Sequence, residues 1–169
     1  MDQALDDDAR LVGKLYDEYA GPVFTYVWRL VNDRDLAEDL TQETFTRVLA
    51  SRERLSEVVN HRAWVYRVAT NTCFRTLRRR HRFAWLPWDA SISGDRRDPA
   101  EEVSQRNVVE EALRALHPEY RAPLLLYLRY GFTIAEVAEA LEISEGAVKT
   151  RIYRARELFR RAYEREKAS

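Results

Sequence analysis

Apolar side chains recur every three or four residues through most of the first 82 positions. Positions with this spacing share one face of an α-helix, so the pattern predicts amphipathic helices rather than strands. The predicted helical segments are 8–31, 32–55 and 61–82. Gly21 and Pro22 lie inside the first segment and predict a local break or restart there. We expect these segments to form one small helical domain, residues 8–82.

The second and third segments each divide into an apolar and a polar side. In the second segment, which Asn32 and Asp33 precede in capping-type positions, the apolar side is formed by Leu36, Leu40, Phe45, Val48 and Leu49. In the third, it is formed by Trp64, Val68, Cys73, Phe74 and Leu77. We expect both apolar sides to be buried in the first domain.

Residues 83–104 interrupt the helical pattern. They hold two prolines, one of the five glycines and several Ser and Asp residues, with no sustained apolar period. The composition predicts a flexible linker between two domains. Trp85 and Trp88 are unusual in such a segment, and two interpretations stay open: they fold back onto a domain, or they dock on a partner.

The helical pattern resumes after the linker and predicts a second domain over 105–166, so the expected fold class is all-α. Two helical segments flank His117–Pro118, and Gly131 is placed to end the second of them. A tight helix-turn-helix pattern follows. Thr133 and Ser144 are natural N-caps of its two helices. The first helix carries one apolar stripe, made by Ile134, Val137, Ala138 and Leu141.

The second helix of this unit holds most of its cationic side chains. Its inward positions are Ala147, Val148, Ile152, Ala155 and Phe159. Its outward or flanking positions are Lys149, Thr150, Arg151, Tyr153, Arg154 and Arg156. A helix fits the major groove of DNA, where cationic and hydroxyl groups contact phosphates and base edges. The pattern favours duplex-DNA binding over a solvated basic helix that only complements its own dipole.

The formal net charge of the chain is zero, but the charge is segregated along it. Residues 1–60 carry thirteen acidic against seven basic side chains, whereas residues 61–82 carry seven arginines and no Asp or Glu. Residues 143–169 carry eight basic against four acidic side chains. Two basic blocks therefore lie in an otherwise acidic chain, and each can create a strong local field that the average hides.

The first basic block mixes arginines with aromatic and amide side chains. This mixture suits single-stranded nucleic acid, because cations neutralise phosphates while unstacked bases meet rings and hydrogen-bonding groups. The candidate strand-binding residues are Trp64, Tyr66, Arg67, Asn71, Arg75, Arg78, Arg79, Arg80 and Arg82. An Arg-rich amphipathic helix could instead lie on an anionic membrane or be a solvated face.

The acidic side of the second segment would repel DNA, so it should face something else. Its carboxylates are Asp35, Glu38, Asp39 and Glu43. A basic protein surface would complement them, although ordinary solvated charge gives the same pattern.

The sequence offers little for an enzyme. It has no phosphate-binding glycine loop, its three histidines share no metal-ligand spacing, and its single cysteine, Cys73, falls on a predicted inner face. We therefore expect no catalytic residues, no metal and no cofactor. The first residues are acidic, and no apolar run approaches the roughly 18–20 residues of a membrane span, so neither export nor membrane insertion is expected.

Three pieces of the chain, in this order, resemble the extracytoplasmic-function (group 4) sigma factors of bacterial RNA polymerase, within the sigma-seventy family. They are "YDEYAGPVFTYVWRLVNDRDLAEDLTQETFTRVL", "HRAWVYRVATNTCFRTLRRRHR" and "ALHPEYRAPLLLYLRYGFTIAEVAEALEISEGAVKTRIYRARELF". The resemblance covers almost the whole chain, and "GAVKTRIYRAREL" is its most specific part. It implies an alternative sigma factor that binds core RNA polymerase in the bacterial cytoplasm and directs promoter recognition, promoter melting and transcription initiation.

The resemblance also implies roles by position. The polymerase partners would be the clamp helices of the beta-prime subunit and the beta flap, and the clamp-binding residues would be Asp35, Glu38, Asp39, Gln42, Glu43 and Phe45. Asn71 and the arginines after it would capture the non-template strand of the melted minus-ten element. The minus-thirty-five element would be read as duplex DNA by Lys149, Thr150, Tyr153 and Arg154. An anti-sigma factor is the further partner that the family implies.

The alternative hypothesis is a stand-alone helix-turn-helix repressor or activator. Such a protein would normally dimerise to read two half-sites about one turn of DNA apart. Dependence on core polymerase for promoter binding separates the two hypotheses.

Overall fold

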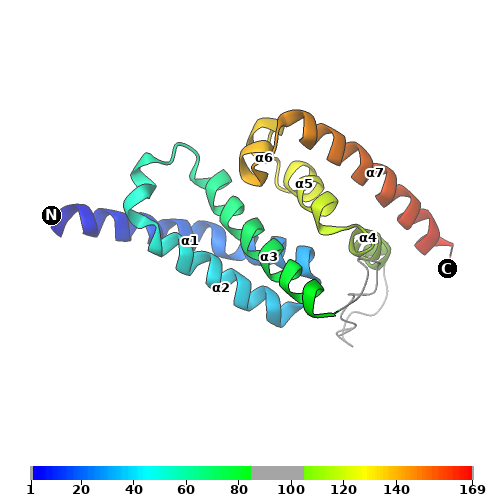
Figure 1. Ribbon diagram of the computed structural model, residues 1–169, viewed down its shortest axis with the longest axis horizontal. Helices are drawn as coiled ribbons and strands as arrows, with labels where there is room; N and C mark the ends of the chain where they lie inside the picture. Colours follow the sequence, from blue (N-terminus) through cyan, green and yellow to red (C-terminus); the bar gives the residue numbers. More distant parts are fainter. Residues whose placement is uncertain (1, 85–104, 169) are drawn as a thin grey trace.

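The computed structural model describes the backbone of residues 2–84 and 105–168, and the side chains of residues 7–81 and 108–168. Every element in these ranges is helical, so the all-α prediction is confirmed (Figure 1). The elements are α1 (Asp2–Val31), α2 (Arg34–Ala50), the 3-10 helix η1 (Arg52–Glu57), α3 (His61–Ala84), α4 (Gln105–Arg114), α5 (Pro118–Leu128), α6 (Ile134–Leu141) and α7 (Glu145–Lys167).

Helices α1–α3 pack on one another, and α4–α7 form a second helical group. Most of the predicted linker, including Trp85 and Trp88, lies outside the described residues. None of the helices in the described ranges combines the length and the apolar character that crossing a membrane requires.

Helix α1 runs without interruption through Gly21 and Pro22, so the predicted break is wrong. A proline inside a helix removes one backbone hydrogen bond and usually kinks the helix. The carbonyl group that Pro22 leaves unpaired is that of Glu18, four residues earlier, and this residue is exposed, so water can reach it. Directly after Pro22, Val23, Tyr26 and Val27 are completely buried, and their burial keeps this turn in line with the one before it.

Helix α2 begins where the sequence predicted but ends earlier. The Asp33 side chain caps it by accepting a hydrogen bond of 2.9 Å from the backbone N–H of Leu36. The helix stops at Ala50, and the chain tightens into η1. Leu49 was predicted to point inward but is 47% exposed. Val48 takes the buried position of that turn, and the next residue of a helix points about 100° away.

The second group contains the predicted helix-turn-helix, α6 and α7. Helix α5 starts at Pro118, and the preceding His117 Nδ1 accepts a hydrogen bond of 3.1 Å from the backbone N–H of Glu119. Soon after α5 ends, Gly131 takes a φ of 67°, a left-handed conformation that glycine adopts without steric cost. Gly131 thus lies in the turn where the chain has left α5, which fits its predicted role at the end of that helix.

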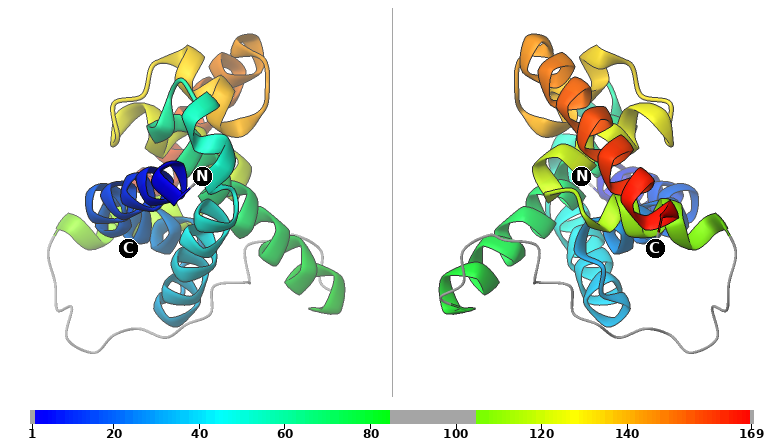
Figure 2. Two further views of the ribbon diagram at one scale, coloured as in Figure 1. Left: turned by 90° about the vertical axis from the view of Figure 1, so that its left-hand side faces the viewer. Right: turned by 90° about the vertical axis from the view of Figure 1, so that its right-hand side faces the viewer.

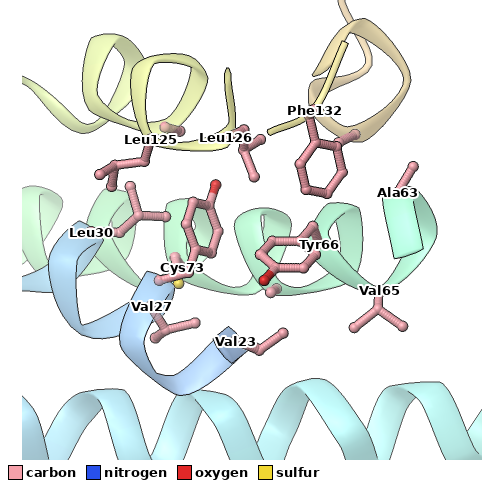
Figure 3. Packing of buried hydrophobic residues seen from close by; sticks show 14 of the residues in the cluster. Val23, Val27, Leu30, Ala63, Val65, Tyr66, Cys73, Leu125, Leu126 and Phe132 are labelled. Atoms are coloured by element: carbon pink, nitrogen blue, oxygen red, sulfur yellow. The ribbon is translucent and has the colours of Figure 1, made fainter. Parts of the chain in front are cut away.

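One continuous apolar core runs from the first helical group into the second (Figure 3). Tyr66 of α3 packs in it with its ring centroid 5.1 Å from that of Phe132 and 5.4 Å from that of Tyr130. Figure 3 also shows Leu30 of α1 and Leu125 of α5 among the side chains of this core. Cys73 is completely buried in it, as predicted, and this burial raises the pKa of its thiol. The two groups therefore form one closed arrangement.

A buried arginine joins the C-terminal ends of two helices. Arg121 of α5 is 3% exposed and donates hydrogen bonds to four backbone carbonyl groups. Two of them, Arg29 and Leu30 in the last turn of α1, lie at 2.7 and 3.2 Å. The other two, Arg114 and Leu116 at the end of α4, lie at 2.7 and 2.6 Å. Carbonyl groups at a helix C-terminus have no partner within their own helix, so Arg121 supplies the missing donors.

The charge of Arg121 suits this position. The C-terminal end of a helix carries partial negative charge, and two such ends meet at this guanidinium. Burial lowers the pKa of Arg121 to about 10, which still leaves the side chain charged at neutral pH.

The substitution Arg121→Met should lower the free energy of unfolding by about 2–3 kcal/mol, because it keeps an unbranched apolar stem but leaves buried carbonyl groups without donors. Denaturant unfolding followed by circular dichroism measures this change. Arg129→Met, at the exposed end of the same helix, is the matched control and should change the free energy by less than about 0.5 kcal/mol. Equal effects of the two substitutions would contradict the stabilising role of Arg121.

Candidate nucleic-acid interface

Side-chain caps begin both helices of the helix-turn-helix. Thr133 Oγ1 accepts a hydrogen bond of 3.2 Å from the Glu136 N–H, and Glu136 Oε2 accepts one of 2.8 Å from the Thr133 N–H. This reciprocal capping box begins α6. Ser144 Oγ accepts a hydrogen bond of 3.1 Å from the Ala147 N–H and begins α7. Both predicted caps are confirmed, and they set the direction of α7 relative to α6.

Helix α7 presents the predicted duplex-binding residues on its outer side. Its inner stripe of Val148, Ile152 and Ala155 is buried against the rest of the second group. The exposed candidates are Lys149, Thr150, Tyr153, Arg154 and Arg156, while Arg151 is half-buried at the edge. The Tyr153 ring is 69% exposed. This ring is therefore accessible to a ligand in the middle of the exposed cationic row.

The predicted strand-binding arginines of α3 differ in their surroundings. Arg78, Arg79 and Arg80 are exposed near the C-terminal end of the helix. Arg75 pairs with Glu43 at 2.6 Å, and Arg80 pairs with Asp33 at 3.6 Å. These two ion pairs hold part of the arginine row against α2 and its N-cap.

Tyr66 belongs to the core, which corrects its prediction as a strand-binding residue. Its side chain is 1% exposed, and burial raises its pKa. It shares the inner stripe of α3 with Ala63, Thr70 and Cys73, all of them buried, so it cannot stack on a base in this arrangement. Trp64 is half-buried, and the side chain of Arg82 lies outside the described residues.

The acidic side of α2 faces solvent. Asp35, Glu38, Asp39 and Gln42 are exposed, and Glu43 is half-buried between Arg47 and Arg75. Phe45, which was predicted to contact polymerase, is only 6% exposed, and its ring packs edge-on against that of Tyr16 with centroids 5.0 Å apart. Phe45 therefore belongs to the core under the acidic side of α2 and is not part of the exposed surface.

Two apolar side chains beside the acidic row were missed by the sequence analysis. Tyr16 of α1 is 53% exposed and Leu49 of α2 is 47% exposed. Leu49 lies seven residues after Gln42 and so on the same side of α2. The signal was present in the sequence, because Val48 already fills the inward position of that turn.

The closed arrangement brings two of the predicted strand-binding residues against the helix-turn-helix. Glu142, in the turn between α6 and α7, forms an ion pair of 3.2 Å with Arg67 and accepts a hydrogen bond of 3.1 Å from Asn71. Helix α6 packs against α3, and the end-on views show the α6–α7 unit next to the start of that helix (Figure 2). The sequence analysis had placed Arg67 and Asn71 in one domain and the helix-turn-helix in another, with no contact expected between them.

The start of α3 makes further contacts with the second group. The Asn60 side chain caps α3 by accepting from the Ala63 N–H at 2.9 Å, and it donates to Glu136 at 3.1 Å. Arg62 donates to the Tyr130 carbonyl group, and its guanidinium lies 4.1 Å from the centroid of the Phe132 ring. None of these contacts had a local signal in the sequence, because each joins residues far apart along the chain.

Family comparisons match the two helical groups separately. The model described as "Sigma-70 region 2" matches residues 15–83, and that described as "Sigma-70, region 4" matches residues 106–159. Among curated proteins, the chain is 33% identical over 151 residues to the ECF RNA polymerase sigma factor SigL of Mycobacterium tuberculosis, covering 86% of this chain and 85% of SigL.

Solved structures with a similar fold include two proteins in complex with a partner protein. The sigma factor RpoE, in complex with the anti-sigma factor NepR from Bartonella quintana, matches with a TM-score of 0.73 and 21% identity, over 90% of this chain and 96% of RpoE. CnrH, in complex with the cytosolic domain of CnrY, matches with a TM-score of 0.63 and 21% identity, over 96% of this chain and 93% of CnrH. At this identity the likeness establishes the fold.

The contact between Glu136 and the cap of α6 should make stability depend on pH in acid. The hydrogen bond from the Thr133 N–H lowers the pKa of Glu136 below its ordinary value of 4.5. A lowered pKa in the folded state contributes stability that is present above the unfolded value and is lost as pH falls through the folded value. The difference in Tm between the native protein and Glu136→Gln should therefore be present at pH 7 and shrink as pH falls below 4.5.

Thermal unfolding by circular dichroism across this pH range measures that difference. Glu139→Gln changes an exposed carboxylate of the same helix and should leave Tm within about 1 °C of the native value at neutral pH. A Glu136→Gln difference that stayed constant into acid would contradict the assignment of the bond to the charged carboxylate.

Proposed function

The chain belongs to the extracytoplasmic-function family of RNA polymerase sigma factors, and on that premise we propose that its two basic helices recognise two physical forms of one promoter. As a member of this family it is a transcription initiation factor that acts with RNA polymerase on promoter DNA, and not an enzyme. The proposal depends above all on the exposed cationic row of α7, which the capped turn presents opposite a buried apolar stripe.

Helix α7 would read the minus-thirty-five element in the major groove. Arginine and lysine donate to guanine edges and phosphates, and the Thr150 hydroxyl and Tyr153 ring add polar and apolar contacts. The residues proposed for this contact are Lys149, Thr150, Arg151, Tyr153, Arg154 and Arg156. Arg156 lies at the border of the surface, with its guanidinium 5.9 Å from the centroid of the Tyr127 ring.

Helix α3 would bind the non-template strand of the melted minus-ten element. Exposed arginines can neutralise its phosphates, and the amide of Asn71 can bond to a base that has left the stack. The residues proposed for this contact are Trp64, Arg67, Asn71, Arg75, Arg78, Arg79, Arg80 and Arg82. Several of them are held by carboxylates in this arrangement, so strand binding requires those ion pairs to exchange.

The outer side of α2 would bind the clamp helices of the beta-prime subunit. Asp35, Glu38, Asp39, Gln42 and Glu43 supply an acidic row, and the exposed Tyr16 and Leu49 next to it supply apolar contact area. An acidic row with an apolar border fits a basic protein surface and repels DNA. The beta flap would be the second polymerase contact.

The two helical groups would carry different functions. We assign core polymerase and minus-ten binding to residues 8–82, and minus-thirty-five binding to residues 105–166. Control by an anti-sigma factor is proposed because RpoE and CnrH, which share this fold, were both solved with a bound partner. The family also implies that the protein acts in the bacterial cytoplasm, where RNA polymerase is.

In vitro transcription with core polymerase, on promoters identified by mapping start sites after overproduction, tests the proposal. Arg154→Ala should weaken recognition of the minus-thirty-five element by about 1–3 kcal/mol while binding to core polymerase stays unchanged. Holoenzyme affinity for promoters with intact and scrambled upstream elements measures the loss. A variant that discriminated between the two promoters as well as the native protein would contradict the role of Arg154.

Asp39→Arg should weaken binding to core polymerase by at least about tenfold, because it places a cation against a basic partner surface. Fluorescence titration of labelled protein with core polymerase measures the affinity. Glu53→Arg makes the same change of charge at an exposed position of η1, outside the acidic row, and should bind like the native protein. Equal losses in the two variants would mean that α2 has been assigned the wrong partner.

A further inference from the structure

Glu142 fills the space between two residues proposed to bind the minus-ten strand. One carboxylate oxygen lies 3.2 Å from Nη2 of Arg67, and the other accepts a hydrogen bond of 3.1 Å from Nδ2 of Asn71. A guanidinium and an amide are also the donors that bind phosphate oxygens and base edges. The two side chains therefore form an anion site, and a carboxylate of the same chain occupies it here.

The backbone at Glu142 does not explain why a glutamate stands there. This residue has a φ of 54°, in the left-handed region, at the C-cap of α6. Glycine and asparagine suit such a cap, whereas other residues adopt it with some strain. The contacts with Arg67 and Asn71 give this side chain a role that the turn itself does not require.

The contact is weak enough to be exchanged for DNA. The side chains of Arg67 and Glu142 are 41% and 50% exposed, and exposed ion pairs contribute little to stability because water screens them. The closed arrangement is held mainly elsewhere, by Arg121 and by the packing of Tyr66 on Phe132. Glu142 thus occupies the proposed strand site and adds only a little to the stability of the closed arrangement.

The promoter itself requires the two helical groups to separate. The minus-ten and minus-thirty-five elements lie about 25 base pairs apart, which is about 85 Å of duplex at about 3.4 Å per base pair. In the closed arrangement α3 and α6 are in direct contact. One molecule cannot reach both elements in that state, so the residues that join the groups must part before a promoter is fully bound.

From these observations we propose that Glu142 is an internal competitor of single-stranded DNA, which keeps Arg67 and Asn71 occupied until the α6–α7 turn leaves α3. The inference rests on the proposed function of α3 and adds its regulation. Only the open fraction of the free protein can bind the strand, so the apparent affinity is reduced by that fraction. By the same linkage, bound strand shifts the protein toward the open state.

The test compares Glu142→Gln with Glu139→Gln in the full chain. Both remove one exposed carboxylate from the same turn region, but only Glu142 contacts α3. The probe is a fluorescent single-stranded oligonucleotide with the non-template minus-ten sequence of a mapped promoter, titrated by anisotropy. Glu142→Gln should bind it about two- to fivefold more tightly than the native protein, and Glu139→Gln should not. Small-angle scattering should show a larger radius of gyration on adding the strand.

Glu142→Gly is a second variant that controls for misfolding, because glycine suits the left-handed backbone at this position. It should give the same gain in affinity for the strand. With core polymerase present the gain should disappear, since the promoter complex already separates the two groups. Equal strand affinity for the native protein and both Glu142 variants, with Arg67→Ala still losing binding, would overturn the competitor role and leave the proposed function intact. If Arg67→Ala bound the strand normally, the strand site itself would be misassigned and both proposals would fall.

Discussion

The closed structure depends on supplying donors to helix ends that would otherwise be buried without them. Helices α1 and α4 both end where the two helical groups meet, and four backbone carbonyl groups in or just after their last turns accept hydrogen bonds from one guanidinium, that of Arg121. Arginine is suited to this position because its fork of N–H groups can reach several acceptors at once and because its charge complements both helix dipoles. A shorter or neutral side chain would leave buried carbonyl groups unpaired, which is costly. This requirement sets where α5 lies against α1.

Local features of the chain could be predicted because their physical causes are local. The caps at Asp33, Thr133 and Ser144 bond to backbone groups three residues away, and the left-handed turn at Gly131 depends on the glycine itself. The apolar period therefore predicted the all-helical class and the helix-turn-helix correctly. Pro22 is the exception, since burial of the residues after it outweighs its local preference for a break.

Packing between distant segments could not be predicted in the same way. Tyr66 and Phe45 have side chains that suit a binding surface, and nothing within a few residues of them shows that Phe132 and Tyr16 cover them. The contacts of Glu142 with α3 join residues about seventy positions apart and have no periodic signal. The outer face of α7 was predicted correctly because its inner stripe alone determines which side remains outside.

The arginines of α3 are partly neutralised by carboxylates from other parts of the fold. This helix carries seven arginines from residue 61 to residue 82 and no acidic side chain of its own, yet within the described residues three of these arginines pair with carboxylates elsewhere in the fold. Glu43 and Asp33 come from the first helical group, and Glu142 comes from the second. A nucleic acid that binds this helix must therefore displace internal carboxylates as well as solution ions. Each carboxylate set free attracts cations from solution, which offsets part of the counterion release from the nucleic acid. In this state Arg67, Arg75 and Arg80 are less available to a polyanion, and a partner that separated the two groups would free Arg67 together with Asn71.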